Sequence, residues 1–83
     1  MTGAALRLVG HSDCELCTDL HALLLSDATI AARGVQWLEL PEHPELVNLY
    51  LFRVPVLLLG EREIWQGPGD TQTCARVVAE LKA

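Results

Sequence analysis

Two cysteines three positions apart, Cys14 and Cys17, limit the possible folds of this chain more than any other feature. Directly before them, residues 6–9 (Leu-Arg-Leu-Val) alternate and then meet Gly10, a pattern that predicts a short strand ending in a turn. Directly after the first cysteine, leucines recur at helical spacing and form one apolar face, at Leu16, Leu20, Leu23 and Leu24. The pair is therefore expected between a strand and a helix, where a tight first turn brings two sulfurs close enough to bond.

Polar residues mark the limits of that helix. Ser12 and Glu15 have the spacing of a capping box, so the helix is expected to start at Ser12 or within two residues of it. Asp27 would fall in the middle of the leucine face, so the helix is expected to end beside it. A further short turn is expected to run to Arg33, after which Gly34 suits a C-cap.

The remaining chain predicts three further strands and two further helices. Strands are expected over residues 35–40, 54–59 and 62–65. One helix is expected to have Pro44 in its first turn, and the last helix is expected to be capped by Asp70 or Thr71. The apolar faces of these helices are Leu46, Leu49 and Tyr50 in the first, and Cys74, Val77, Val78 and Leu81 in the second. The order βαβαββα predicts a parallel first pair and an antiparallel closing hairpin in one α/β domain over residues 1–83.

Composition excludes several classes of function. The chain has 83 residues and a net charge of -5, so the phosphate backbone of a nucleic acid would repel it. No apolar run is long enough to span a membrane, and the N-terminus (Met1 to Arg7) lacks the pattern of a signal peptide. Three cysteines are an odd number, unlike a secreted disulfide framework, so a reducing cytoplasm is the expected compartment. We expect a monomer with no nucleic-acid or membrane partner.

The two cysteines have different surroundings. Cys14 falls where unpaired amide N–H groups of a helix start converge, which favours its thiolate. Asp13 and Glu15 flank it and oppose that effect, so we expect a reduction potential nearer to about -270 mV than to the oxidising value of about -120 mV. Cys17 lies at the edge of the leucine face. The pattern therefore predicts an attacking Cys14 and a shielded, resolving Cys17.

Two other interpretations of the pair stay open. In the first, the cysteine pair supplies half of the ligands of a zinc site, and in the second it is an inert reduced pair. The remaining metal ligands would come from His11, His21, His43 and Cys74. Cys74 belongs to the apolar face of the last helix and is expected to be an inert core cysteine, so no metal is expected. Trp37 and Trp65 are expected in strands, in or at the edge of the core.

The sequence resembles the glutaredoxin-like family of the thioredoxin-fold superfamily, and within it a small bacterial group of undefined role. The resemblance is carried by residues 14–17 (Cys-Glu-Leu-Cys), residues 53–56 (Arg-Val-Pro-Val), the loop 67–70 (Gly-Pro-Gly-Asp) and the acidic segment 41–45. It implies a four-stranded mixed sheet with flanking helices. It also implies a cis peptide bond between Val54 and Pro55, facing the sulfurs and presenting the backbone N–H and C=O of Val54 to a substrate.

The same resemblance suggests two contacts to glutathione. Arg53 would pair with a carboxylate of glutathione and Asp70 with its amino group. The alternatives are a solvated surface charge for Arg53 and a helix cap for Asp70. This chain departs from the glutathione-using members at three places. They carry Lys shortly before the first cysteine, where this chain has Gly-His-Ser-Asp at residues 10–13. They have Pro-Tyr between the cysteines and Thr before Val-Pro, where this chain has Glu15-Leu16 and Arg53.

These features predict a thiol–disulfide oxidoreductase without a resident cofactor, with glutathione as a possible co-substrate. Its substrate is expected to be a protein disulfide or a low-molecular-weight disulfide, and glutathione or a reductase would restore the dithiol. The acidic residues Asp13, Glu15 and Asp19 favour a basic patch on a protein partner. The alternatives are an iron–sulfur or metal carrier that uses the cysteine pair, and a binding module without catalytic activity.

Overall fold

The computed structural model describes residues 4–83. Residues 1–3, part of the segment considered above for a signal peptide, lie outside the described residues. No helix within residues 4–83 combines the length and the apolarity that crossing a lipid bilayer requires. The elements in chain order are β1 (Leu6–Gly10), α1 (Glu15–Leu25), α2 (Ala28–Arg33), β2 (Gln36–Glu39), the 3-10 turn η1 (Leu40–Glu42), α3 (Pro44–Tyr50), β3 (Val56–Leu59), β4 (Arg62–Gln66) and α4 (Thr73–Lys82).

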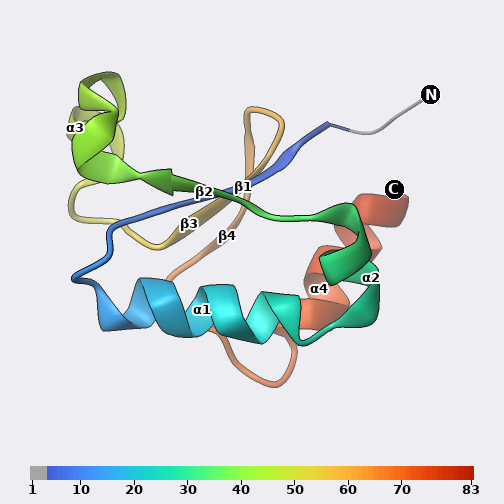
Figure 1. Ribbon diagram of the computed structural model, residues 1–83. Coiled ribbons are helices and arrows are strands. Elements are labelled where there is room, and N and C mark those ends of the chain that lie inside the picture. Colours follow the sequence, from blue (N-terminus) through green and yellow to red (C-terminus); the bar gives the residue numbers. More distant parts are fainter. Residues whose placement is uncertain (1–3) are drawn as a thin grey trace.

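The four strands form one mixed sheet in the order β2-β1-β3-β4 (Figure 1). β1 and β2 are parallel and β3 and β4 antiparallel, as the sequence predicts. β1 and β3 are also antiparallel neighbours, with Val9 opposite Val56. The end of β1, from which the chain continues to the cysteines, therefore lies beside the start of β3.

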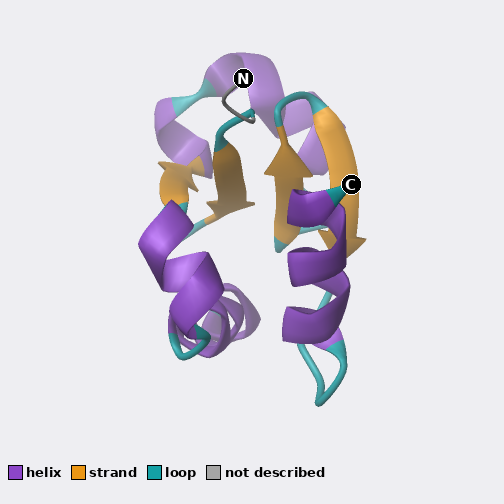
Figure 2. Ribbon diagram, turned by 90° about the vertical axis from the view of Figure 1, so that its right-hand side faces the viewer, coloured by secondary structure: helices purple, strands orange, loops and turns teal. Residues whose placement is uncertain are grey.

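Helices cover both faces of the sheet, so its strands bury side chains on both sides (Figure 2). One core lies between the sheet and the helices α1, α2 and α4 and contains Leu6, Leu8, Leu20, Leu24, Ile30, Leu57, Ile64 and Val77. The other lies between the sheet and α3 with η1 and contains Val9, Leu38, Leu40, Tyr50, Val56 and Leu58. Successive residues of β1 and of β3 belong to opposite cores, as the two-residue period of a strand requires.

The break between α1 and α2 lies where the sequence predicts it. α1 ends at Leu25, and Asp27 caps α2 by accepting hydrogen bonds from the backbone N–H of Thr29 (2.9 Å) and Ile30 (3.1 Å). Gly34 ends α2 at a φ of 87°, a conformation that favours glycine. The break turns Ile30 into the core, where a continuous helix would have placed the Asp27 carboxylate.

Three local predictions are wrong. The capping box of Ser12 and Glu15 does not form, because Ser12 bonds to Glu39 and the helix is capped instead by Cys14. The N-cap of α4 is Gln72 and not Asp70 or Thr71, so the helix begins at Thr73. Asp70 caps the turn before the helix, where its carboxylate accepts from the Gln72 N–H at 2.8 Å.

The third wrong prediction concerns the buried face of α3. Leu49 was expected on its buried face but is 56% exposed, while Tyr50 is buried and Leu46 and Val47 pack against the core. At 3.6 residues per turn, Leu46, Val47 and Tyr50 lie on one side of the helix, and Leu49 lies about 100° away from the middle of that side. Its far side and the loop after it remain in solvent, and Phe52 in that loop is 96% exposed.

Candidate active site

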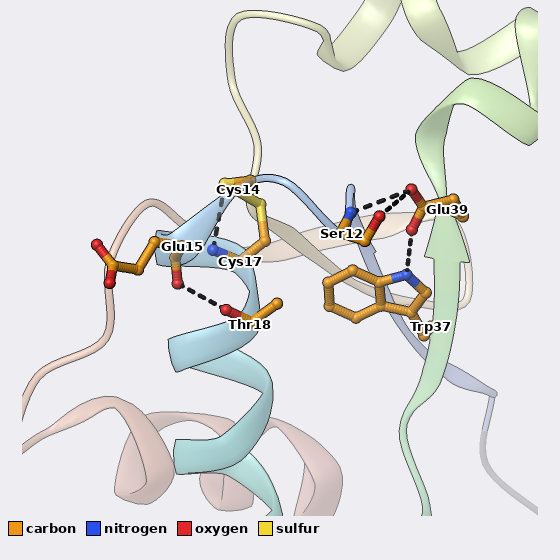
Figure 3. Close-up of a disulfide and its surroundings, with 7 residues drawn as sticks. All are labelled: Ser12, Cys14, Glu15, Cys17, Thr18, Trp37 and Glu39. Carbon is orange, nitrogen blue, oxygen red and sulfur yellow. Dashed lines mark hydrogen bonds between the residues drawn. A yellow bond between two sulfur atoms is a disulfide. The ribbon is translucent and has the colours of Figure 1, made fainter.

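Cys14 and Cys17 form a disulfide at the N-terminus of α1, with their Cα atoms 5.2 Å apart (Figure 3). Cys14 has an extended backbone and is the N-cap, and its Sγ accepts a hydrogen bond from the Cys17 N–H at 3.2 Å. Cys14 is half-buried whereas Cys17 is fully buried. One sulfur of the bond can therefore be approached from solvent, and the other is covered.

Gly10, the last residue of β1, allows Cys17 to pack closely against the sheet. A Cβ atom at this position would lie 2.8 Å from the Cβ of Cys17 and 3.0 Å from its Sγ. The same Cβ would lie 3.3 Å from Cη2 of the Trp37 ring. All three distances are shorter than the about 3.5–4.0 Å at which non-bonded carbon atoms pack. The absence of a side chain at Gly10 thus leaves the space that Cys17 and Trp37 share.

Glu39, at the end of β2, holds together two parts of this site. One carboxylate oxygen accepts from the indole N–H of Trp37 (2.8 Å), and the other accepts from the backbone N–H (3.0 Å) and hydroxyl (3.1 Å) of Ser12. These hydrogen bonds, with that from Trp37 contributing most, lower the pKa of the Glu39 carboxyl below its ordinary value of 4.5. Glu39 therefore carries a negative charge at neutral pH.

Val54 and Pro55 precede β3 at the end of the sheet where β1 leads to the cysteines. The peptide bond between them is cis, as the family resemblance implies. Pro55 is buried, and its carbonyl accepts from the Gly67 N–H at 2.9 Å. The Val54 N–H donates to the Tyr50 carbonyl at 3.1 Å, so in this structure that donor is bonded within the chain, and substrate binding by Val54 stays a prediction. The end of α3 uses this donor to satisfy one of its last carbonyls.

Comparisons with known proteins bear on this arrangement. No protein-family model matches the chain, and no curated protein matches its sequence. The structure is similar to that of thioredoxin 1 from the thermophilic eubacterium Thermosipho africanus TCF52B, with a TM-score of 0.61 over 94% of each chain and 17% sequence identity. The fold is thioredoxin-like. At this identity the similarity concerns the architecture, and the chemistry has to be argued from the residues of this chain.

Within the thioredoxin-like fold, Arg53 is engaged by groups of the chain itself. Its guanidinium forms an ion pair with Glu63 and also donates to the side-chain oxygen of Gln66 at 3.2 Å. It lies 5.4 Å from the centre of the Tyr50 ring. A carboxylate of a bound molecule would have to compete with Glu63 for this cation.

Asp70, like Arg53, forms its hydrogen bonds within the chain. Its carboxylate accepts from the Gln72 N–H and from the hydroxyl of Thr73 (3.3 Å), and its own N–H donates to that hydroxyl at 2.7 Å. Thr73 is fully buried, so this exchange satisfies its hydroxyl. Asp70 therefore orders the turn that leads into α4.

Two remaining candidates from the sequence are also placed by the structure. His21 lies one turn beyond Cys17 and contacts the Trp37 ring, with 5.2 Å between the ring centres. Cys74 is half-buried, and its thiol donates to the Leu23 carbonyl at 3.4 Å. Burial raises the pKa of the Cys74 thiol, and the nearby charge of Asp27 adds to this effect. Within residues 4–83, no three His, Cys, Asp or Glu side chains gather to form a metal site.

Neither Glu39 nor the position of Trp37 at the site was predicted from the sequence. A signal for both was present, because residues two apart on a strand face the same side and residues 37 and 39 supply a donor and an acceptor. The partner of Glu39 could not be found this way. Ser12 lies 27 positions away, and only the parallel register of β1 and β2 brings the two together.

Proposed function

We propose that this protein is a thiol–disulfide oxidoreductase of glutaredoxin-like type. The proposal is carried by one observation, the unequal exposure of the two sulfurs of the Cys14–Cys17 disulfide. A half-buried sulfur at a helix N-terminus can react with a disulfide substrate, since its thiolate is favoured there and one side of it is open to solvent. A buried sulfur three residues later can react only with its neighbour.

The reaction begins with the reduced dithiol. The Cys14 thiolate attacks one sulfur of a substrate disulfide and forms a mixed disulfide, while the other substrate sulfur leaves as a thiolate. Cys17 then loses its proton and attacks the Cys14 sulfur, which releases the second substrate thiolate. Two electrons have passed to the substrate, and Cys14 and Cys17 are left as the disulfide. A dithiol reductase or two molecules of glutathione return the two electrons.

The surroundings of Cys14 favour a polypeptide as substrate. Leu16 lies between the cysteines and is 49% exposed, and Phe52 lies two positions before Val54. The carbonyl of Val54 and the buried ring of Pro55 would border the substrate backbone. Asp13 and Glu15 are exposed beside Cys14. A partner with basic residues flanking an apolar segment fits this surface.

For the reductant, the contacts of Arg53 and Asp70 favour a reductase over glutathione. Both side chains that would bind glutathione are bonded within the chain, to Glu63 and to the turn before α4. Glutathione binding at Arg53 would first have to break the ion pair. We therefore propose that a reductase restores the dithiol and that glutathione reacts only by direct exchange at Cys14.

Mass measurement of the thiols tests the central step. Oxidation should remove about 2 Da from the peptide that contains Cys14 and Cys17, and dithiothreitol should restore it. Reduction of a protein disulfide should be lost in Cys14→Ser, and Cys17→Ser should accumulate the mixed disulfide. Cys74→Ser, which changes the third thiol of the chain, is the matched control and should keep full activity. Undiminished activity in Cys14→Ser would disprove the proposal, since a binding module keeps its function without either cysteine.

A further inference from the structure

Trp37 forms one wall of the space that holds the buried sulfur of Cys17. Its ring shares with that sulfur the space left by Gly10, and Figure 3 shows the ring turned toward Cys17. His21 contacts the ring at 5.2 Å between centres. The ring also packs against the core between the sheet and α1. Trp37 is thus placed to keep solvent and small reagents away from Cys17.

The hydrogen bonds of Glu39 fix this ring. Trp37 belongs to β2, an edge strand, and is itself only half-buried, so other side chains pack against its ring on one side only. The indole N–H donates to one carboxylate oxygen of Glu39 at 2.8 Å. The second oxygen is occupied by Ser12, in the loop that leads to Cys14. A carboxylate satisfies both requirements at once, because both of its oxygens accept and neither donates.

We infer that Glu39 is a positioning residue, which holds Trp37 over Cys17 and so keeps the resolving sulfur from reacting with anything but Cys14. This inference rests on the proposed function. Its chemical consequence is selectivity: external disulfides and alkylating reagents meet Cys14, and Cys17 reacts only once Cys14 carries a mixed disulfide. Glu39 does not touch the reacting atoms in this scheme, and it acts through Trp37 and Ser12.

Alkylation of the reduced protein, with each cysteine followed by peptide mass, tests the inference. Glu39→Met keeps the length of the side chain and removes both acceptors, whereas Glu39→Gln keeps one acceptor. Loss of a hydrogen bond to a charged group should speed iodoacetamide alkylation of Cys17 at least about fivefold in Glu39→Met and less in Glu39→Gln. Glu42→Gln removes an exposed charge three residues away and should leave the rate unchanged.

Cys74 provides a reference for general loosening, since its half-buried thiol lies on α4 and bonds to the end of α1. A change of Cys17 within about twofold in Glu39→Met, or an equal rise at Cys74, would overturn the inference. If Glu39→Met does not fold, Trp37→Phe keeps an aromatic ring without the donor and should also expose Cys17. An unchanged Cys17 rate in that variant would likewise count against the inference.

A second measurement follows the positioning of Cys17 directly. In the Cys74→Ser protein, which lacks the third thiol, attack by Cys14 on dithiobis(nitrobenzoate) releases one chromophore, and attack by Cys17 on the mixed disulfide releases the second. Glu39→Met should slow the second release and leave the first unchanged. Equal second-phase rates in both proteins would show that Glu39 positions nothing. The alkylation result does not depend on turnover, so selective exposure of Cys17 can be found even in a protein that reduces no physiological disulfide.

Discussion

Replacing Gly10 by alanine tests how closely the sheet packs against the buried cysteine. The added methyl group would lie 2.8 Å from the Cβ of Cys17 and 3.0 Å from its Sγ, and both neighbours are held by the sheet and helix α1. The backbone of Gly10 is not among the glycines with positive φ in residues 4–83, so alanine introduces no backbone strain there. The substitution therefore isolates the effect of packing.

The expected loss of stability follows from two opposing contributions. Overpacking of a core costs about 1–3 kcal/mol. The alanine restricts the unfolded chain and returns about 0.4–1 kcal/mol. The middle of each range, about 2 kcal/mol against about 0.7 kcal/mol, gives a net loss of about 1–2 kcal/mol. The total stability of a chain of this length is about 4–12 kcal/mol. Unfolding entropy near 2.1 cal/mol/K per residue converts each kcal/mol into about 6 °C, so the melting temperature should fall by about 6–12 °C.

Thermal unfolding followed by circular dichroism measures this shift in the oxidised protein. Gly34→Ala is the comparison, because nothing lies within 4 Å of its added methyl group but its φ of 87° is unfavourable for alanine. That variant should lose stability through its backbone, while the alkylation rate of Cys17 in the reduced protein stays unchanged. Gly10→Ala should change both. A melting temperature within about 2 °C of the parent in Gly10→Ala would refute the packing argument.

Three further predictions concern other parts of the chain. Asp27→Ala removes the cap of α2 and should cost about 1 kcal/mol in urea denaturation, whereas Asp27→Asn keeps the acceptor and should cost much less. Glu63→Gln releases Arg53 from its ion pair and should lower the KM for glutathione by up to about fivefold. Turnover with dithiothreitol should not change. An unchanged KM would show that Arg53 does not bind glutathione. Folding lowers the pKa of Glu39, so the contribution of this carboxylate to stability is complete above pH 4.5, its ordinary pKa, and should be lost as the pH falls through the lowered pKa. Glu39→Gln should flatten this part of the plot of stability against pH. Identical plots for the two proteins would contradict the assignment.

The elements that could be predicted from the sequence are those fixed by local patterns. The leucines after Cys14 specify α1 by their spacing, and Asp27 and Gly34 mark α2 because a cap and a left-handed glycine are requirements of a single turn. The parallel pairing of β1 and β2 followed from their long connection. The position of Cys17 on the buried side of the helix followed from the same leucine spacing.

The features that could not be predicted depend on contacts between distant segments. Ser12 has an acceptor at the correct local spacing in Glu15, and yet it bonds to Glu39 because the register of two strands brings that carboxylate closer. The Val54 N–H is taken by the end of α3, a choice that depends on where that helix stops. Leu49 is exposed because the sheet packs against the side of α3 that carries Leu46, Val47 and Tyr50, and the helical spacing alone does not choose that side.

The strand order has a consequence for self-association. The borders of the sheet are β2 and β4, whose outer main-chain groups would be available to a strand of another molecule. β2 has only four residues and runs directly into η1, whose proline cannot donate to a growing ladder. β4 begins with the charged residues Arg62 and Glu63, and a bulge interrupts its pairing with β3. Short length on one border and charge with irregularity on the other protect a chain that is 51% apolar from fibril-like stacking.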